Sequence, residues 1–276
     1  MKNIIIMILL FTFLIFSNCD ESINAISIEE NIAVQAYLYA GEQVDDIRLN
    51  STIPLDVDTN YAPPINDAEV FLIKNDKTYE LESSAGDSGY YHYSGDDLIV
   101  ESGDNFQLLI IYQDYEITAE TIVPTPPSLV TLSSDELSVP DFSSGNMSQI
   151  REWMDAGMMS IDVTWESNSN EWFYVTLENI EDDPEEIETM RPDRMMMRVF
   201  PPIADTQYQI RQPSLTHLGK HKINIYAVNI EYANLYSSRN QDSRDLQEPL
   251  TNIEGGLGVF TSFAADTAFF TVKKAS

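Results

Sequence analysis

The sequence predicts an all-β protein, made of two β-sandwich domains behind a short apolar leader. Three observations support this fold class. Short runs of alternating apolar and polar residues dominate the chain, these runs are rich in β-branched and aromatic residues, and turn-forming residues separate them. Alternation with period two is the signal of a half-buried strand. Hydrophobic residues make up 43% of the chain and aromatic residues 11%, which is enough for packed cores.

The leader, residues 1–18, is interpreted as a signal peptide. Lys2 precedes the apolar run Ile4–Phe16. As a helix this run would cover about 20 Å, whereas a bilayer core is about 30 Å thick. The run is therefore too short for a membrane-spanning helix and typical of the apolar region of a signal peptide.

Cys19 is the only cysteine in the chain, and it ends the stretch LIFSNC. This stretch resembles a bacterial lipobox, in which signal peptidase II cuts before a cysteine that carries a diacyl group. The resemblance implies a covalent lipid, such as palmitate, on Cys19. A lone cysteine cannot form an internal disulfide, and lipidation removes a thiol that would be a liability in an oxidising compartment. The alternative is a secreted protein with an incidental cysteine.

The residues after Cys19 indicate where in the cell the protein is located. Asp20 and Glu21 follow it directly and resemble the surface-export signal of Bacteroidota lipoproteins. Several acyl chains together anchor a protein stably. We therefore expect a lipid-anchored protein of the outer membrane with residues 19–30 as a tether. The cell surface is the expected face and the periplasmic face is the alternative.

The first block, residues 31–127, is expected to form the N-terminal β-sandwich. In its first strand Ile32, Val34, Ala36 and Leu38 share one face. The run PTPPS, from Pro124 to Ser128, ends the block, because proline cannot donate ladder hydrogen bonds. The predicted strands lie at residues 31–42, 68–81 (a hairpin turning at Asn75-Asp76), 89–95 and 105–123 (a hairpin turning at Gln113-Asp114).

The second block, residues 128–276, is expected to form another β-sandwich that includes the C-terminal strands. Only residues 146–158 show helical spacing, which predicts a short connecting helix. The sequence leaves open which block the C-terminal strands complete. The predicted strands lie at residues 160–165, 171–180, 194–203, 206–215 and 220–230, with two further β-rich pieces in residues 252–272.

Several phrases resemble known families. SIDVTW and HKINIYAVN resemble the early tryptophan strand and a late strand of fibronectin type III domains, although His221 stands where that family has its corner tyrosine. In the first block Ala68, Val70 and Leu72, followed by Gly89 and Tyr91, resemble transthyretin-like and carboxypeptidase-regulatory-like modules.

A wider resemblance covers most of residues 31–272. The phrases are VQAYLYAGEQVDDIRL, INDAEVFL, DKTYEL, GYYHY, EITAETIVP and NIEGGLGVF. They resemble a Bacteroidota lipoprotein family that is catalogued as a domain of unknown function. Its members are commonly encoded beside TonB-dependent receptors. The resemblance implies a β-barrel receptor as partner and supplies no catalytic residues.

Two groups of residues are candidates for metal binding. Asp56, Asp58 and Asn60 have the spacing of a calcium loop, but Tyr61 and Asp67 stand where an EF-hand needs Gly and Glu. They form either a weak calcium site or a solvated loop. His217 and His221 lie where a turn enters a strand, so they form either a zinc pair or two separate histidines.

Two groups of residues are candidates for a binding surface. Methionines repack against varied partners, and three of them precede an arginine in one segment. This segment is either a binding patch or a strand with one methionine face in the core. Five tyrosines of the first block form either an exposed aromatic strip or ordinary cross-strand pairs. The first group is Met195, Met196, Met197 and Arg198, and the second is Tyr37, Tyr39, Tyr90, Tyr91 and Tyr93.

No catalytic constellation is apparent in the sequence. The GGLG run, Gly255–Gly258, lacks the Lys-Ser/Thr of a phosphate loop, which indicates a tight bend or bulge. A net charge of −30 argues against nucleic acid and anionic lipid as partners. We therefore expect a non-enzymatic lipoprotein without a cofactor, accessory to a TonB-dependent receptor in ligand capture or uptake. The alternative is a structural or adhesive protein, and a surface-polymer hydrolase ranks third.

Overall fold

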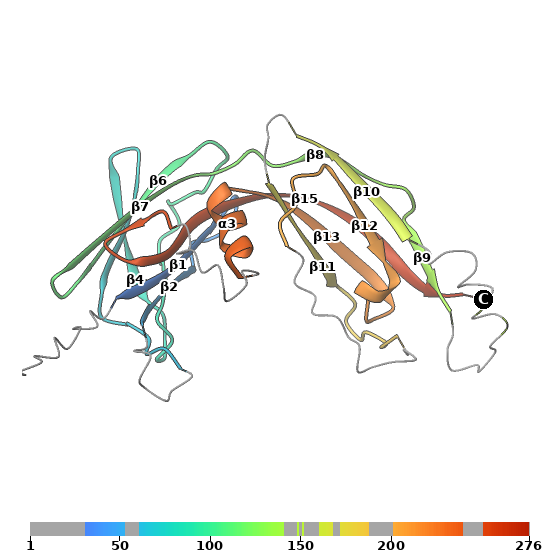
Figure 1. The fold of residues 1–276 in the computed structure, drawn as a ribbon, viewed down its shortest axis with the longest axis horizontal. Helices are drawn as coiled ribbons and strands as arrows, with labels where there is room; N and C mark the ends of the chain where they lie inside the picture. The colour runs from blue at the N-terminus through green and yellow to red at the C-terminus, as the bar shows by residue number, and fades with distance from the viewer. Residues whose placement is uncertain are drawn as a thin grey trace, which may run out of the picture.

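The described residues form two β-rich halves that one long strand joins into an arch (Figure 1). Most of them lie in strands, so the predicted all-β fold class is confirmed. No helix among them is long and apolar enough to cross a membrane. The predicted helix at residues 146–158 falls outside the described part, apart from Ser148 and Arg151, which are helical. The computed structural model describes residues 31–52, 61–140, 148, 151, 160–167, 172–187, 201–239 and 251–275.

The first half has strands at all the positions predicted for the first block, and one more, at residues 46–51, that was not predicted. They are β1 (Ile32–Tyr39), β2 (Asp46–Ser51), β3 (Glu69–Lys74), β4 (Lys77–Ser83), β5 (Tyr90–His92), β6 (Asn105–Tyr112) and β7 (Tyr115–Ile122), completed by β14 (Ile253–Glu254) and part of β15 (Leu257–Lys274). Their order in the curled sheet is β15-β1-β2-β5-β4-β3-β6-β7-β14. Both hairpins turn where the sequence predicts, with positive φ at Asn75, Asp76 and Gln113. Such residues match the twist of a tight hairpin.

The core of the first half follows the predicted alternation. Along β1 the side chains of Ile32, Val34, Ala36 and Leu38 are exposed by 3% or less. Burying a Val, Leu or Ile side chain contributes about 1.5–3 kcal/mol. A slip of one residue would turn all four of them to the other face of the sheet, so burial fixes the register of the strand.

The second half consists of two sheets packed face to face (Figure 1). Trp165 and Phe173, one from each sheet, meet edge to face with ring centroids 5.2 Å apart. One sheet contains β8 (Ser128–Leu132), β10 (Ser160–Glu166) and β12 (Gln207–Arg211), and the other contains β9 (Glu136–Val139), β11 (Trp172–Asn179), β13 (Gly219–Val228) and β15. Strands β8 and β9 were not predicted from the sequence.

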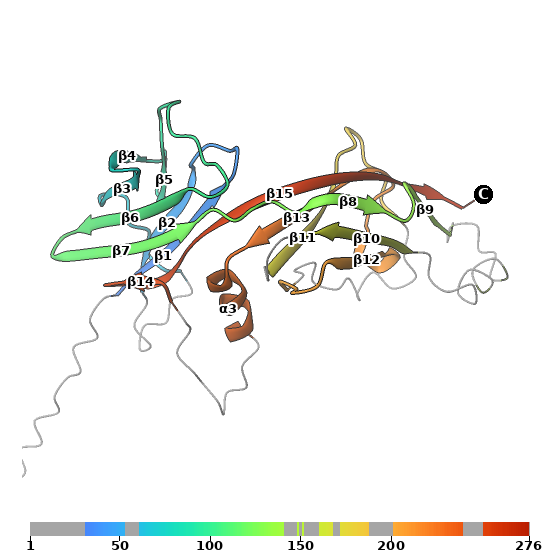
Figure 2. The same cartoon turned by 90° about the horizontal axis from the view of Figure 1, so that it is seen from above.

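Strand β15 belongs to both halves (Figure 2). It has 18 residues, so it is about 60 Å long at about 3.3 Å per residue. From Leu257 to Phe263 it pairs with β1 in parallel, and from Phe263 to Val272 it pairs with β13 in antiparallel. The C-terminal segment has two strands, as predicted, of two and 18 residues. They complete the first half as well as the second.

Gly255 and Gly256 form the bend between β14 and β15 that the sequence predicts, and β15 begins at Leu257, inside the GGLG run. Gly258 has φ +118°, and a Cβ atom there would lie 1.9 Å from the carbonyl oxygen of Val34. Gly255 has φ +77°, and its Cβ atom would lie 2.4 Å from the carbonyl oxygen of Glu116. Only glycine lets the backbone approach both strands this closely.

Two predictions from the sequence are wrong in detail. The strand predicted over residues 206–215 ends at Arg211, and a 3₁₀ turn, η3 (Gln212–Ser214), follows. Pro213 explains this end, because proline has no N–H for the ladder. The strand predicted up to Ile230 ends at Val228. The helix α3 (Ile230–Arg239) begins two residues later. The backbone N–H of Tyr232 donates to the carbonyl of Asn229, which starts the helix.

Candidate functional site

The structure places only part of the residues that the sequence proposes as sites. The lipidation site Cys19 lies outside the described residues, with the leader and the tether. The calcium candidates Asp56, Asp58 and Asn60 also lie outside them, and so does the patch Met195, Met196, Met197 and Arg198. Each of these stays a prediction.

The five tyrosines do not form one strip. Tyr91 is buried, and its hydroxyl donates to the carbonyl of Ile65 at 3.1 Å. The ring of Tyr90 lies under the guanidinium of Arg48, 5.2 Å away. Tyr93 packs edge to face on Tyr79 at 5.4 Å. These three tyrosines make ordinary sheet contacts within the first half.

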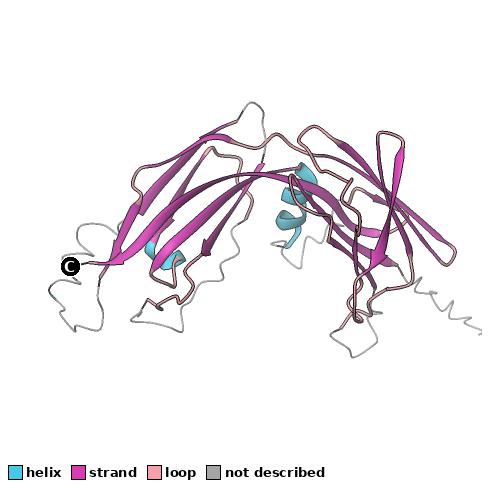
Figure 3. Ribbon diagram, turned by 180° about the vertical axis from the view of Figure 1, so that it is seen from behind, coloured by secondary structure: helices cyan, strands magenta, loops and turns pink. Residues whose placement is uncertain are grey.

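Tyr37 and Tyr39 belong to a different group, at the centre of the arch. Here eight aromatic side chains from five elements meet around Val228. We call this group the aromatic junction. It lies where α3 occupies the angle between the two halves (Figure 3). Its members are Tyr37 and Tyr39 from β1, Trp172 and Tyr174 from β11, Tyr226 from β13, Tyr232 and Tyr236 from α3, and Phe263 from β15.

Phe263 lies at the middle of the aromatic junction, and only 2% of its surface is exposed. Its ring stacks on Tyr39 with centroids 4.9 Å apart. It also meets Tyr37 at 5.6 Å, Tyr226 at 6.0 Å and Tyr232 at 4.9 Å, each edge to face. Phe263 is also the residue at which the partner of β15 changes from β1 to β13. One side chain thus contacts both halves and the helix.

Burial raises the pKa of the Tyr39 and Tyr174 phenols in the aromatic junction, so both stay neutral over the physiological pH range. Burial raises the pKa of Tyr174 to about 12, helped by the neighbouring Tyr236. Burial also raises the pKa of Tyr39, with a further contribution from the charge of Asp46. The Tyr39 hydroxyl donates to Oδ2 of Asp46 at 3.4 Å. The half-buried phenols therefore present hydroxyl groups that can donate or accept hydrogen bonds.

A polar contact set holds the two halves together beside the aromatic junction. The side-chain amide of Asn229, just before α3, donates to Oγ1 of Thr121 at 2.8 Å and to the carbonyl of Ile122 at 3.1 Å. The hydroxyl of Ser262 on β15 donates to the same carbonyl at 3.0 Å. These bonds satisfy the edge of β7 and tie it to α3 and β15.

His217 and His221, the candidate zinc pair, both line one pocket of the second half. His221 is buried, and its ring stacks on Phe270 with centroids 5.2 Å apart. Burial lowers the pKa of His221. His217 makes a hydrogen bond with the Thr216 hydroxyl at 2.9 Å. Among the described residues no group of three or more His, Cys, Asp or Glu side chains is placed to hold a metal ion.

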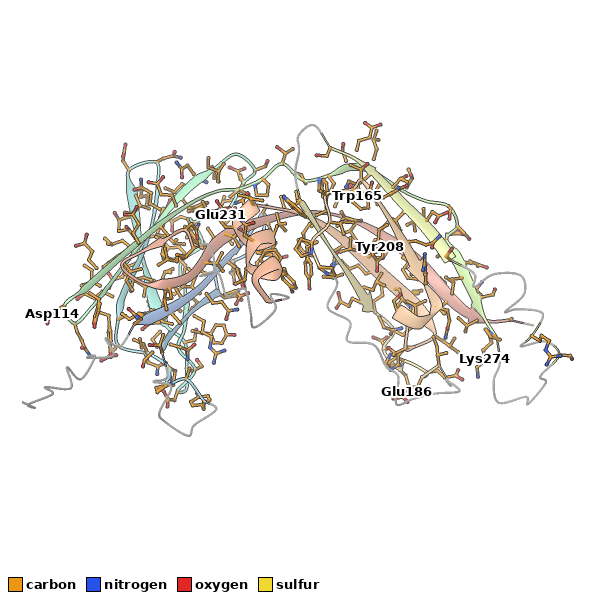
Figure 4. The ribbon with its side chains drawn as sticks, in the orientation of Figure 1. Asp114, Trp165, Glu186, Tyr208, Glu231 and Lys274 are labelled. Atoms are coloured by element: carbon orange, nitrogen blue, oxygen red, sulfur yellow. The ribbon has the colours of Figure 1, made fainter. Side chains whose placement is uncertain are left out.

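Asp114, Lys274 and Tyr208 lie away from the aromatic junction, whereas Glu231 lies on the helix that contributes to it. Asp114, at the tip of the β6–β7 hairpin, and Lys274, near the end of β15, mark the two ends of the long axis (Figure 4). Tyr208 lies among the strands of the second half, and burial raises its pKa to about 12. Glu231 lies at the start of α3.

Sequence reasoning missed most of the aromatic junction. Tyr232 and Tyr236 are four residues apart and follow Asn229, which is the spacing of one helix face after a helix-starting residue. That signal was available in the sequence. The convergence of Trp172, Tyr174 and Phe263 depends on the pairing of distant strands, which local alternation does not reveal.

Comparison with known proteins identifies a family, but this family has no described function. No curated protein matches the chain. A solved structure titled "Ca2+-stabilized adhesin helps an Antarctic bacterium reach out and bind ice" is 13% identical and has a TM-score of 0.21. The match covers 88% of this chain and 49% of that one, so this chain spans about half its length. A likeness this weak carries no argument about function. Residues 20–268 match a family described as "Domain of unknown function (DUF4249)", and the chain belongs to this family.

Proposed function

We propose that this protein is a non-enzymatic, lipid-anchored binding protein of the outer membrane, accessory to a TonB-dependent receptor in ligand capture or uptake. The observation that carries the binding role is the aromatic junction, where six of the eight aromatic side chains are only partly buried. Tyrosine and tryptophan are enriched at binding surfaces, because each offers a large apolar face and a polar group. The side of α3 is the expected contact surface.

The cellular setting of the proposal comes from the sequence. The stretch that ends at Cys19 supports a lipid anchor, and Asp20 and Glu21 support export to the surface. The receptor as partner is supported by the usual gene neighbours of the similar lipoprotein family. This last support is an association and not a property of the fold.

A structural or adhesive role is the second candidate. It is favoured by β15, which runs without interruption through both halves and pairs with β1 and β13. A continuous strand of this kind makes the molecule a stiff spacer. In this case the sandwich faces or sheet edges would hold the partner.

Copurification separates the two functions. The full chain with a C-terminal tag is extracted from outer membranes in mild detergent, and the copurifying proteins are identified. We expect a stoichiometric β-barrel receptor, which is lost with Tyr236→Ala and retained with the control Tyr90→Ala. Recovery of the wild-type protein alone would contradict the accessory role and favour adhesion. Loss of the receptor with both variants would contradict a role for the aromatic junction.

A further inference from the structure

The outward face of the first half carries an apolar strip where a sheet facing water normally carries polar residues. We call it the outer strip. It consists of Phe71 and Ile73 on β3 and Leu109 and Ile111 on β6. Ile111 is 39% exposed and the other three are partly exposed. The residues between them, such as Leu72 and Ile110, point the other way into the core.

Glutamates flank the outer strip on both sides. The strand registers place Phe71 and Leu109 between Glu80 and Thr118, with Glu254 beyond Thr118. In the next row Ile111 lies between Glu69 and Glu116. In the third row across the strands, Ile73 pairs with Gln107, and Gln107 pairs with Glu120. The side-chain amide of Gln107 donates a hydrogen bond to Glu120 at 2.8 Å. All five rim glutamates are exposed.

Basic side chains do not neutralise this rim within the described part of the chain. The ion pairs recorded there use Asp97, Asp104, Glu136 and Glu185, and not the five glutamates. The lysines nearest along the strands, Lys74 and Lys77, are held by Asp104 and Asp97 at the end of the hairpin. The face therefore keeps its negative charge around an apolar centre.

A groove lies beside the outer strip. Its volume is about 650 Å³. Ile73 and Leu109 line one wall, and residues 251–254 line the other. Asn252 fixes this second wall, because its side chain donates to the carbonyl of Glu120 at 3.1 Å and pairs with both backbone groups of Phe260. Strands β6, β7 and β14 thus form the groove together with the short segment that precedes β14.

We propose that the outer strip and its groove dock a segment of a partner protein that carries lysine or arginine on either side of aliphatic side chains. Charge complementarity selects this occupant. A second copy of the chain would oppose five more glutamates, and an anionic lipid surface would be repelled. Spacing of two between apolar side chains would match the strip if the segment is extended. The inference is independent of the aromatic junction, whose residues lie on other elements.

A defined peptide tests the proposal. The probe is a fluorescent 12-residue peptide with four lysines at each end and a central Leu-Ser-Leu-Ser, measured by anisotropy against the mature chain, residues 20–276, made without the lipid. The matched variants are Ile111→Thr in the outer strip and Ile99→Thr, at a position that is 57% exposed elsewhere on the same half. Both replacements are β-branched, so the fold is expected to persist, and circular dichroism checks this.

We expect Ile111→Thr to weaken binding about tenfold, as for a well-packed contact at an interface, and Ile99→Thr to leave it unchanged. A peptide with serine in place of leucine should bind at least tenfold more weakly than the probe. Equal binding by the two variants, or equal binding of the serine peptide, would show general attraction to an acidic protein and would overturn the proposal. Absence of binding to the wild-type chain would also overturn it.

Discussion

Replacing Phe263 by alanine should destabilise both halves of the molecule at once. Phe263 is 2% exposed, and its ring touches four other aromatic rings. Phe-to-Ala changes in a core cost about 3–5 kcal/mol, as lost burial plus the cavity that remains. The four ring contacts place this site toward the middle of that range or above, so we expect a loss of about 4 kcal/mol.

The matched control lies on the same strand. Phe269 is also on β15, but it is 60% exposed. Phe269→Ala removes the same atoms from a position facing water and should change the free energy of unfolding by no more than about 0.5 kcal/mol. The difference between the two variants isolates the packing in the aromatic junction from any effect of phenylalanine on strand propensity.

Urea unfolding of the mature chain measures the effect with two probes. The three tryptophans are Trp153, Trp165 and Trp172, so tryptophan fluorescence reports on residues 128–276, and far-ultraviolet circular dichroism reports on both halves. For the wild type we expect coincident transitions, because β15 completes both sheets. Phe263→Ala should move both urea transitions together to a lower midpoint, and in thermal unfolding it should lower the Tm by roughly 8–16 °C.

Two results would refute this reasoning. If Phe263→Ala unfolds like Phe269→Ala, the ring contacts do not contribute as the structure implies. If only the fluorescence transition moves, the first half is stable without the aromatic junction, and β15 does not couple the halves.

Three further predictions concern the bend, the polar contact set and the phenols. Gly258→Ala should lower the free energy of unfolding, measured in urea, by about 3 kcal/mol or more, because the new Cβ atom would meet a backbone oxygen. The control Gly41→Ala has open space around it and should lower the free energy of unfolding by about 1 kcal/mol. Asn229→Ala should cost about 1–2 kcal/mol through lost hydrogen bonds, and the exposed Asn105→Ala less than about 0.5 kcal/mol. Thermal unfolding should show a loss of stability as pH rises from about 10 to about 12, and Tyr174→Phe should reduce this loss.

The sign of the pH effect follows from the neutral form of the phenol. Folding raises the pKa of Tyr174 to about 12, so the folded state holds the proton more tightly than the unfolded state, whose tyrosine pKa is about 10. The stabilisation is complete below pH 10 and is lost as pH rises to 12. A flat profile over this range would contradict the burial of the Tyr174 hydroxyl. If Gly258→Ala and Gly41→Ala lowered the free energy of unfolding equally, the account of the bend would be contradicted. The same result for Asn229→Ala and Asn105→Ala would contradict the account of the polar contact set.

Local signals in the sequence predicted most strands of the first half, but not β2. Alternation placed Ile32, Val34, Ala36 and Leu38 on one buried face, and Asn75-Asp76 marked its hairpin. Both signals act over a few residues, where backbone sterics and burial on one face determine the outcome. Long-range pairing has no such local mark. Nothing in the run around Phe263 distinguishes it from its neighbours, although the partner of the strand changes there.

The aromatic junction was only partly accessible to sequence reasoning for the same reason. Tyr37 and Tyr39 could be identified as candidates, but not assigned to an exposed strip or to packed contacts, because their neighbours lie on β13, α3 and β15. The predicted end of β13 at Ile230 is two residues too late, because the helical spacing of Tyr232 and Tyr236 after Asn229 was overlooked.

The position of β15 in the chain has a consequence for biogenesis. It is translated after every other strand described, yet the first half needs its residues 257–263 beside β1. Since the chain is made from its N-terminus, β1 has no partner on this edge until residues 257–263 are present. During this interval the nascent chain remains a substrate for chaperones and proteases. Both sheets are complete only when the chain extends to residue 274. A product truncated before β15 would lack a strand in both halves and would be exposed to proteases.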